Sequence, residues 1–349
     1  MSATLLAIDA GTTGVSSVLF DAELRPLQRA YREFAQRFPA PGWVEHDAEA
    51  ILGAVAATLA EVLGHPRARE VATLGVTNQR ETVFALERAS GRALTPGIVW
   101  QDRRTEARCR ELETAGRLAE VRARTGLVLD PYFSATKIEW LLQHDAQLRA
   151  RAEAGEVVFG TVDTLILAYL TRGATLATDP TNASRTMLFD LERRAFDAEL
   201  CAWFGCEPAW LPEVRGSTAD FGLTHPERCF GRTLPIRGVA GDQQAALFGQ
   251  GCFDAGTLKV TFGTGSFLLL NTGAERRAST RGLLTTLAVD RRGGVAYALE
   301  GGAFVCGALV QWLRDQLGFF ARSSEIEPLA RSVSDSGGVF VVPAFAGLG

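Results

Sequence analysis

One pattern occurs twice in this chain of 349 residues: an apolar strand, a turn rich in glycine and threonine, and a second strand. The first copy covers residues 5–20 around the turn Asp9-Ala10-Gly11-Thr12-Thr13-Gly14, and the second covers residues 256–271 around Phe262-Gly263-Thr264-Gly265-Ser266. A repeat of this kind predicts a duplicated architecture with one hairpin in each half. Such turns can present backbone N–H groups to a phosphate, although a plain hairpin is the alternative for the first copy on its own.

Two common kinds of phosphate site are excluded. Neither G-x-x-x-x-G-K-[ST] nor G-x-G-x-x-G occurs, so the chain has no P-loop and no dinucleotide-binding fingerprint. The repeat therefore favours a phosphate held between the two hairpins. Asp9 stands at the end of the first strand, where a carboxylate can hold Mg²⁺ through water.

Polar residues follow a predicted strand over residues 71–77, in the run Asn78-Gln79-Arg80-Glu81-Thr82. The carboxyl ends of buried strands are where open α/β sheets place ligands. Arg80 and Glu81 could hydrogen-bond a small polyol there. A surface ion pair fits the same spacing equally well, because such pairs are common.

Two aromatic residues stand at comparable positions. Trp100 ends a predicted strand over residues 98–100 and is followed by Gln101-Asp102-Arg103-Arg104, while Tyr132 precedes an amphipathic helix. Trp100 could form an apolar wall against carbon-bound hydrogens, but a lone tryptophan is more often part of a core.

Asp242 follows a predicted strand over residues 234–240 and begins a helix of small residues, in the run Gly241-Asp242-Gln243-Gln244. Gly241 permits the tight turn. A carboxylate at this place can be a general base in a cleft or a helix cap. The local pattern alone favours the cap, since aspartate is a preferred N-cap residue.

The composition is that of a globular protein, with 47% hydrophobic and 22% charged residues and a net charge of −4. No basic block offers a surface to nucleic acid or anionic membrane. The six cysteines show no C-x-x-C spacing, which predicts free thiols in a reducing compartment. We find no signal peptide and no apolar run long enough to cross a bilayer, and we expect a cytoplasmic protein.

Further elements are predicted from periodicity. Asp47 begins a helix with an apolar face, residues 190–204 read as helical, and residues 339–342 read as a strand. A strand over residues 294–299 leads to a helix on which Gly307 and Gln311 share a face.

Seven motifs, taken together and in order, resemble the glycerol kinase branch of the FGGY carbohydrate kinases. They are Asp9-Ala10-Gly11-Thr12-Thr13, Thr77-Asn78-Gln79-Arg80-Glu81-Thr82, Trp100-Gln101-Asp102-Arg103-Arg104, Asp130-Pro131-Tyr132-Phe133-Ser134, Thr181-Asn182-Ala183-Ser184-Arg185-Thr186, Gly241-Asp242-Gln243-Gln244 and Gly263-Thr264-Gly265. The resemblance spans residues 5–349. The pairing of Arg80 and Glu81 with Trp100 and Tyr132 is typical of glycerol over other polyols and sugars.

The resemblance implies an α/β, actin-like ATPase (ribonuclease H-like) fold with two domains around a cleft. Residues 1–249 would form the FGGY N-terminal domain, which binds polyol and phosphate. Residues 250–349 would form the start of the nucleotide-binding C-terminal domain, which we expect to be incomplete. The implied reaction is ATP-dependent phosphorylation of glycerol to sn-glycerol 3-phosphate, with ATP and Mg²⁺ bound.

The resemblance also implies a role for each site residue. Asp242 would be the general base; the glycerol contacts would be Arg80, Glu81, Tyr132, Asp242 and Gln243, with Trp100 and Phe267 along the carbon face. The ATP contacts would be Thr12, Thr13, Gly14, Thr264, Gly307 and Gln311, and Asp9 would serve Mg²⁺.

The chain departs from the family's pattern at several places. Ser16 stands where a basic residue is usual, which weakens one phosphate contact, and Ala10 stands where glutamine is common. Gly231-Arg232-Thr233 replaces the Gly-Thr-Arg run of members regulated by fructose 1,6-bisphosphate, so we do not expect that regulation. The family's chains also run on beyond Gly349, so we expect a fragment, a truncated gene product or a partial record.

Two alternatives stay open from the sequence. One is an FGGY kinase for another polyol or sugar, and the other is a truncated member that binds polyol or a partner but transfers nothing. ATP binding separates the second from a kinase. The sequence leaves open whether the 349 residues are active by themselves and whether they form a homo-oligomer.

Overall fold

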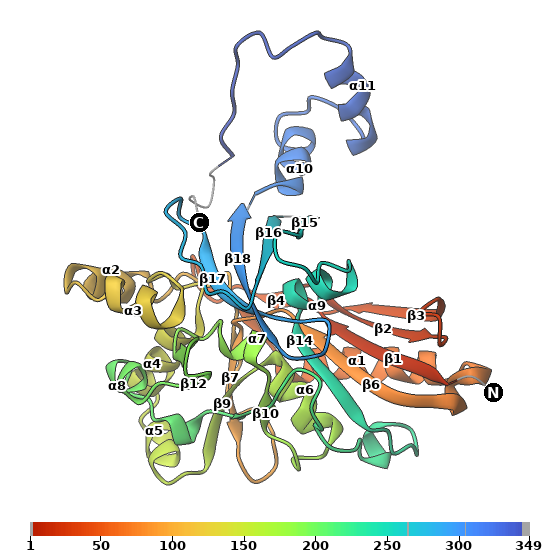
Figure 1. Ribbon diagram of the computed structural model, residues 1–349, viewed down its shortest axis with the longest axis vertical. Helices are drawn as coiled ribbons and strands as arrows, with labels where there is room; N and C mark the ends of the chain where they lie inside the picture. The colour runs from red at the N-terminus through yellow and green to blue at the C-terminus, as the bar shows by residue number, and fades with distance from the viewer. Residues whose placement is uncertain (1–2, 264, 304, 344–349) are drawn as a thin grey trace.

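The computed structural model describes residues 3–263, 265–303 and 305–343. Its first sheet has five strands in the order β14-β6-β1-β2-β3 (Figure 1). The strands are β1 (Thr4–Ala10), β2 (Gly14–Phe20), β3 (Pro26–Glu33), β6 (Val71–Asn78) and β14 (Ile236–Gly241). β1, β2 and β3 are antiparallel neighbours, whereas β6 and β14 run parallel to β1. The carboxyl ends of β1, β6 and β14 therefore meet at one edge.

Helix α1 (Ala48–Leu63) covers β2 and β3 because its apolar residues recur at helical spacing. Ile51, Val55 and Leu59 are fully buried in the core beneath it. Asp47 is the N-cap and accepts a hydrogen bond from the backbone N–H of Glu49 at 3.0 Å, as the sequence predicts. Helix α6 (Val162–Leu170) packs on β6 and completes the same core.

A second sheet lies beside the first, in the order β4-β5-β8-β7-β9. Its strands are β4 (Gln36–Arg37), β5 (Glu45–His46), β7 (Val83–Glu87), β8 (Gly97–Ile98) and β9 (Val157–Thr161). Four helices belong to this part of the molecule: α2 (Glu106–Thr114), α3 (Leu118–Thr125), α4 (Ser134–His144) and α5 (Ala146–Glu153). Together they enclose a second hydrophobic core.

The third sheet is antiparallel, in the order β15-β16-β18-β17. Its strands are β15 (Leu258–Phe262), β16 (Ser266–Gly273), β17 (Leu284–Val289) and β18 (Val295–Ala303). Helix α9 (Asp242–Gly249) joins the first sheet to this one, because it contacts both β14 and β17. β1–β2 and β15–β16 are both antiparallel hairpins, so the predicted repeat of two hairpins is confirmed.

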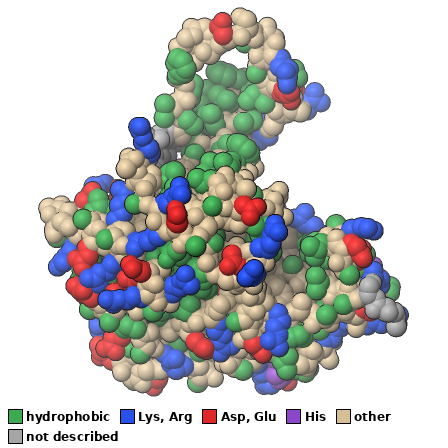
Figure 2. Space-filling model, viewed as in Figure 1, with side chains coloured by type: hydrophobic (Ala, Val, Ile, Leu, Met, Phe, Trp, Pro, Cys, Tyr) green, Lys and Arg blue, Asp and Glu red, His purple; other side chains and the backbone are tan. Residues whose placement is uncertain are grey.

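Helices α10 (Gly307–Asp315) and α11 (Ile326–Arg331) stand away from the three sheets (Figure 1). Their side chains are all partly or fully exposed. Apolar side chains gather on this part of the surface (Figure 2), among them Leu317, Phe319 and Leu329.

The remaining elements are short. They are α7 (Pro180–Ala183), α8 (Ala198–Trp203), β10 (Ala177–Thr178), β11 (Phe189–Asp190), β12 (Ala195–Phe196) and β13 (Glu213–Val214), with 3-10 turns at η1 (Pro66–Glu70), η2 (Pro208–Trp210), η3 (Pro226–Arg228) and η4 (Ser323–Glu325). In the part of the chain that the structure describes, no helix is both long and apolar enough to span a bilayer.

The predicted helix over residues 190–204 is wrong in its first half. Asp190 accepts hydrogen bonds from the backbone N–H groups of Glu192 and Arg193, both at 2.8 Å, and Arg194 has a φ of 55°. This side-chain turn competes with a helix and closes the β11–β12 hairpin instead. The helix begins only after Asp197, which caps α8.

Two predicted strands are also corrected. The strand over residues 98–100 shrinks to β8, because the chain turns at Trp100. Residues 339–342 form no strand with any described segment, and their side chains are exposed, Phe340 by 88%. A strand needs a neighbour to accept its backbone hydrogen bonds.

Candidate active site

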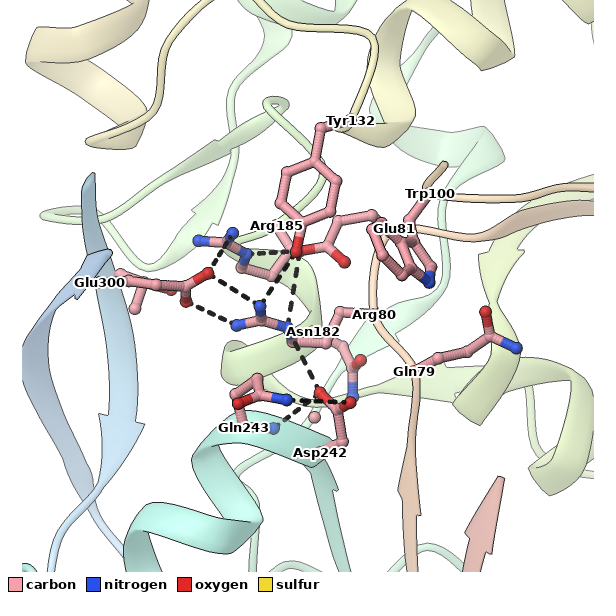
Figure 3. A network of polar contacts seen from close by, with 12 residues as sticks. Gln79, Arg80, Glu81, Trp100, Tyr132, Asn182, Arg185, Asp242, Gln243 and Glu300 are labelled. Carbon is pink, nitrogen blue, oxygen red and sulfur yellow. Dashed lines mark hydrogen bonds and ion pairs between the residues drawn. The ribbon is translucent and has the colours of Figure 1, made fainter. Parts of the chain in front are cut away.

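Arg80 lies at the centre of a buried polar network where the first and third sheets meet (Figure 3). It lies two residues after the end of β6 and is 2% exposed. Its Nη1 and Nη2 atoms donate to the two carboxylate oxygens of Glu300, on β18, at 2.7 and 2.8 Å. Nη2 also donates to the Tyr132 hydroxyl at 3.2 Å. The alternative of a surface ion pair between Arg80 and Glu81 is therefore wrong, because both side chains are buried.

A second buried arginine completes the network. Arg185, which follows α7, donates through Nε to Glu81 at 2.7 Å and through Nη2 to Glu300 at 2.9 Å. Its guanidinium lies 5.2 Å from the ring centre of Phe133. Glu81 is held with a φ of 60°, a backbone conformation that a non-glycine residue rarely adopts. Two arginines thus share two carboxylates, which is how a protein keeps buried charges compensated.

The same neighbours set the protonation of the two carboxylates. Burial would raise the pKa of Glu300, but the charges of Arg185 and Arg80 hold it down at about 2. Burial raises the pKa of Glu81 above its usual range, against the lowering effect of the same two arginines. Glu300 is therefore the fixed anion of the network.

Asp242 faces this network from the first turn of α9 (Figure 3). One of its oxygens, Oδ1, lies 3.5 Å from Arg80 Nε and accepts a hydrogen bond from the backbone N–H of Gln243 at 2.7 Å. The N-cap of α9 is Gly241, so the cap interpretation of Asp242 is wrong. Burial raises the pKa of Asp242, and Arg80 opposes that shift. Its side chain is nevertheless 34% exposed, so the carboxylate can take up a proton from a bound molecule.

Gly241 is required by the close approach of Arg80. A Cβ atom at this position would lie 2.7 Å from the Cγ and Cδ atoms of Arg80. The backbone N–H of Gly241 also donates to Thr181 Oγ1 at 2.8 Å, which anchors the turn before Asp242.

Three aromatic rings form a wall beside Arg80 and Asp242. The ring centre of Trp100 lies 5.7 Å from that of Tyr132 and 6.4 Å from that of Phe267, in both cases edge to face. A cavity of about 280 Å³ adjoins Tyr132, Phe267 and Glu300. The structure therefore brings all the predicted polyol-contacting residues into one cluster, in which the charged side chains and the rings meet at Arg80 and Tyr132.

The first hairpin turn adjoins this cluster. Trp100 Nε1 donates to Thr12 Oγ1 at 2.9 Å, and Thr13 is exposed. Packing requires a glycine at position 14, since a Cβ atom there would lie 2.6 Å from the carbonyl oxygen of Arg32. Next to the turn, Arg29 reaches across from β3 and donates to Ser16 Oγ at 3.2 Å. A cation thus stands at the position where the sequence replaces the usual basic residue by serine.

The second hairpin turn is joined to the start of α10. The backbone N–H of Gly307 donates to the carbonyl of Gly263 at 2.8 Å, which places Gly307 against the turn. Gln311 lies one turn further along α10 and is exposed. Thr264, predicted to contact phosphate, lies outside the described residues.

Asp9 lies near the end of β1, next to the first hairpin turn, where the charge of Asp242 acts on it. Its side chain is accessible to solvent, yet the surrounding protein and the negative charge of Asp242 raise its pKa to about 6, against the opposing effect of Arg29. No three acidic, histidine or cysteine side chains gather as a metal site within the described ranges. These features suit a divalent cation that keeps most of its waters and binds phosphate, as Mg²⁺ does.

Sequence reasoning missed Glu300 and Arg185 as members of the site. Arg185 stood inside one of the seven motifs, but nothing in that run distinguished it from a surface residue. Glu300 directly follows the strand predicted over residues 294–299 and precedes Gly301-Gly302, the same strand-then-polar pattern that drew attention to Arg80. That signal could have identified it.

Comparison with known proteins agrees with this geometry. Residues 4–249 match the N-terminal domain of the FGGY family of carbohydrate kinases, and residues 258–349 match its C-terminal domain. The chain is 52% identical over 347 residues to a glycerol kinase from Rhodospirillum rubrum and 53% identical over 349 residues to one from Methylibium petroleiphilum. Both alignments cover 99% of this chain and 70% of the relative.

Solved structures give the same result. The crystal structure of Plasmodium falciparum glycerol kinase with ADP matches with a TM-score of 0.92 at 34% identity, covering 99% of this chain and 70% of that one. A xylulose kinase from Rhodospirillum rubrum shares the fold, with a TM-score of 0.86 at 23% identity over 99% of this chain and 70% of that one. The predicted two-domain, actin-like fold is confirmed. The chain belongs to the FGGY family of carbohydrate kinases.

Proposed function

We propose that this protein transfers the γ-phosphoryl group of ATP to a terminal hydroxyl of glycerol, forming sn-glycerol 3-phosphate in glycerol catabolism. The observation that carries the proposal is the placement of Asp242, a partly exposed carboxylate 3.5 Å from the buried Arg80, whose guanidinium also contacts Tyr132 in the group of aromatic rings. A three-carbon polyol needs both surfaces, because its hydroxyls require hydrogen-bonding partners and its C–H groups require apolar contact.

In this proposal each side chain acts through the atoms that it presents. Arg80, Glu81, Tyr132 and Gln243 bind the glycerol hydroxyls, and Trp100 and Phe267 lie against its carbons. Asp242 accepts the proton of the attacking hydroxyl as the oxygen–phosphorus bond forms and ADP leaves. Arg80 and Glu300 are locked together, so these donors do not need to reorganise during the reaction.

We assign the phosphate end of the substrate to the two hairpins. Thr12, Thr13 and Gly14 would contact ATP phosphates from the first hairpin and Thr264 from the second, with Gly307 and Gln311 near the nucleoside. Asp9 would hold Mg²⁺ through water. The bound ion would neutralise charge that develops on the transferred phosphoryl group.

In this proposal the N-terminal and C-terminal parts of the chain bind different parts of the substrates. Residues 1–249 would carry the polyol and phosphate contacts, and residues 250–349 would contribute the nucleotide side of the cleft. The free cysteines, five of them buried, and the use of ATP fit a cytoplasmic protein.

The test is a comparison of acceptors with the native protein and ATP. We expect kcat/KM for glycerol to exceed that for xylulose or gluconate by on the order of a hundredfold, because larger acceptors must displace the aromatic wall. Equal or faster turnover of either sugar acceptor would refute the assignment to glycerol. A protein that binds no ATP would refute phosphoryl transfer altogether.

A further inference from the structure

The chain uses lysine at only two of its 36 lysine and arginine positions, Lys137 and Lys259. Both are buried, Lys137 fully and Lys259 to within 5% exposure. Lys259 lies on β15, and its ammonium group reaches the side chains at the start of α9. Burying an ammonium group is costly unless it is paired and hydrogen-bonded, so its partners indicate what it does.

Lys259 has two hydrogen-bond partners among the described residues, one on α9 and one on its own strand, β15. Its Nζ donates to Gln243 Oε1 and, at 2.7 Å, to Thr261 Oγ1, which precedes the turn of the second hairpin. A lysine ammonium has donors only, so the oxygen of the Gln243 amide must face it. The amide nitrogen, Nε2, then faces Asp242 and lies 3.3 Å from Oδ2.

We propose that Lys259 is a positioning residue for phosphoryl transfer: its ammonium group fixes the Gln243 amide so that Nε2 donates to Asp242. This inference rests on the proposed function, in which Asp242 is the base and Gln243 binds glycerol. It adds a residue from the second hairpin to the machinery that activates the acceptor.

Lys259 and Asp242 each affect the pKa of the other, which supports the proposed interaction between them. Burial raises the pKa of Asp242 above its usual range, and Arg80, the hydrogen bonds from Gln243 and the charge of Lys259 oppose that shift. The charge of Asp242 in turn raises the pKa of Asp9. Burial lowers the pKa of Lys259 to about 8; Asp242, Glu300 and Cys252 oppose that shift, and Arg80 adds to it.

Kinetics of two variants test the role in the reaction. Lys259→Met keeps the length of the side chain but removes its donors and charge. We expect kcat/KM for glycerol to fall on the order of tenfold to a hundredfold, because the Gln243 amide and Asp242 are no longer held in position. The acid limb of its pH profile should move to higher pH, because the pKa of Asp242 rises without the cation.

Lys259→Arg is the matched variant. It keeps a charge that does not titrate in this range, so the acid limb should return toward its wild-type position. We expect the wild type to lose activity above about pH 8, as Lys259 loses its proton, and Lys259→Arg to keep its activity there. A Lys259→Met enzyme with an unmoved acid limb would overturn the proposal, whether or not its rate falls.

An NMR titration, which does not require catalytic turnover, tests the interaction between Lys259 and Asp242 directly. Protein labelled with ¹³Cε-lysine has two lysine resonances, and we expect Asp242→Asn to lower the titration midpoint of Lys259 by removing the charge that raises it. Lys137 is the internal control for folding, since the carboxylates that act on it are Glu81, Asp102 and Asp130. An unchanged Lys259 midpoint would overturn the proposal. Failure of the wild type to phosphorylate glycerol would instead refute the proposed function, because the titration does not depend on turnover.

Discussion

Arg80 and Glu300 are 220 positions apart, yet their side chains meet through two hydrogen bonds of 2.7 and 2.8 Å. Arg80 follows a strand of the first sheet, and Glu300 lies on a strand of the third. The pair therefore connects the proposed polyol-binding surface to the sheet that carries the second hairpin. Arg185 joins the same carboxylate, so the negative charge of Glu300 compensates two buried cations.

Glu300→Gln should destabilise the protein strongly. It leaves two buried guanidinium groups short of a negative partner, and breaking a buried ion pair in this way costs about 3–5 kcal/mol. Denaturant unfolding of both proteins measures the difference.

Glu327→Gln is the control for that experiment. It breaks an ion pair with Arg331 in which both side chains are more than 70% exposed, at 72% and 77%. We expect a change below about 1 kcal/mol. If both variants lost the same free energy of unfolding, the buried ion pairs of Glu300 would stabilise the protein no more than an exposed ion pair does.

Tyr132→Phe should weaken glycerol binding with little change in kcat. The hydroxyl that it removes contacts Arg80 and, in our proposal, glycerol, and a neutral hydrogen bond contributes roughly 0.5–1.5 kcal/mol. That range corresponds to an increase in KM of about twofold to tenfold.

Tyr297→Phe is its matched control, since this buried hydroxyl donates to the carbonyl of Leu191 away from the site. We expect lower stability and an unchanged KM. A Tyr132→Phe enzyme with wild-type KM would remove the hydroxyl from the set of glycerol contacts.

The buried, neutral His46 should cause the folded protein to lose stability as the pH falls. Burial lowers its pKa from 6.5 to about 4, and it lies between the amides of Gln36 and Gln79. The unfolded chain takes up a proton below pH 6.5, whereas the folded protein does so only near pH 4. The stabilisation is therefore present above pH 6.5 and is lost as the pH falls to 4, by up to about 3 kcal/mol.

His46→Gln removes this titration, and the comparison cancels the effects of other groups. We expect the unfolding free energy of the wild type to fall more steeply than that of the variant between pH 6.5 and 4. Parallel curves would mean that His46 titrates normally.

The paired hairpins and the helix after Asp47 could be predicted, because each is specified by residues close together in the sequence. The two failures have different causes, one local and one remote in sequence. Around Asp190 the side chain of one aspartate outweighs the helical pattern that follows it. The predicted strand ends before Trp100 because the chain turns there, and the Trp100 side chain contacts Thr12 and Tyr132, which come from distant segments.

The sequence pointed to candidate site residues where polar residues come soon after an apolar strand, as Arg80 and Asp242 do. The spacing could not show whether Arg80 and Glu81 would be buried, because their partners Arg185 and Glu300 are remote in sequence. Asp242 could not be told from a helix cap for a similar reason. Only the structure places Gly241 at the cap and Arg80 beside the carboxylate.

The most direct test of the account is the effect of Asp242→Asn on glycerol phosphorylation by the native protein. The amide keeps the shape and the contact with the backbone of Gln243 but cannot accept the hydroxyl proton. We expect kcat to fall by about 10²–10⁴-fold while the affinity for glycerol stays within a few-fold. A kcat that falls less than about tenfold, at unchanged affinity, would contradict the assignment of Asp242 as the base.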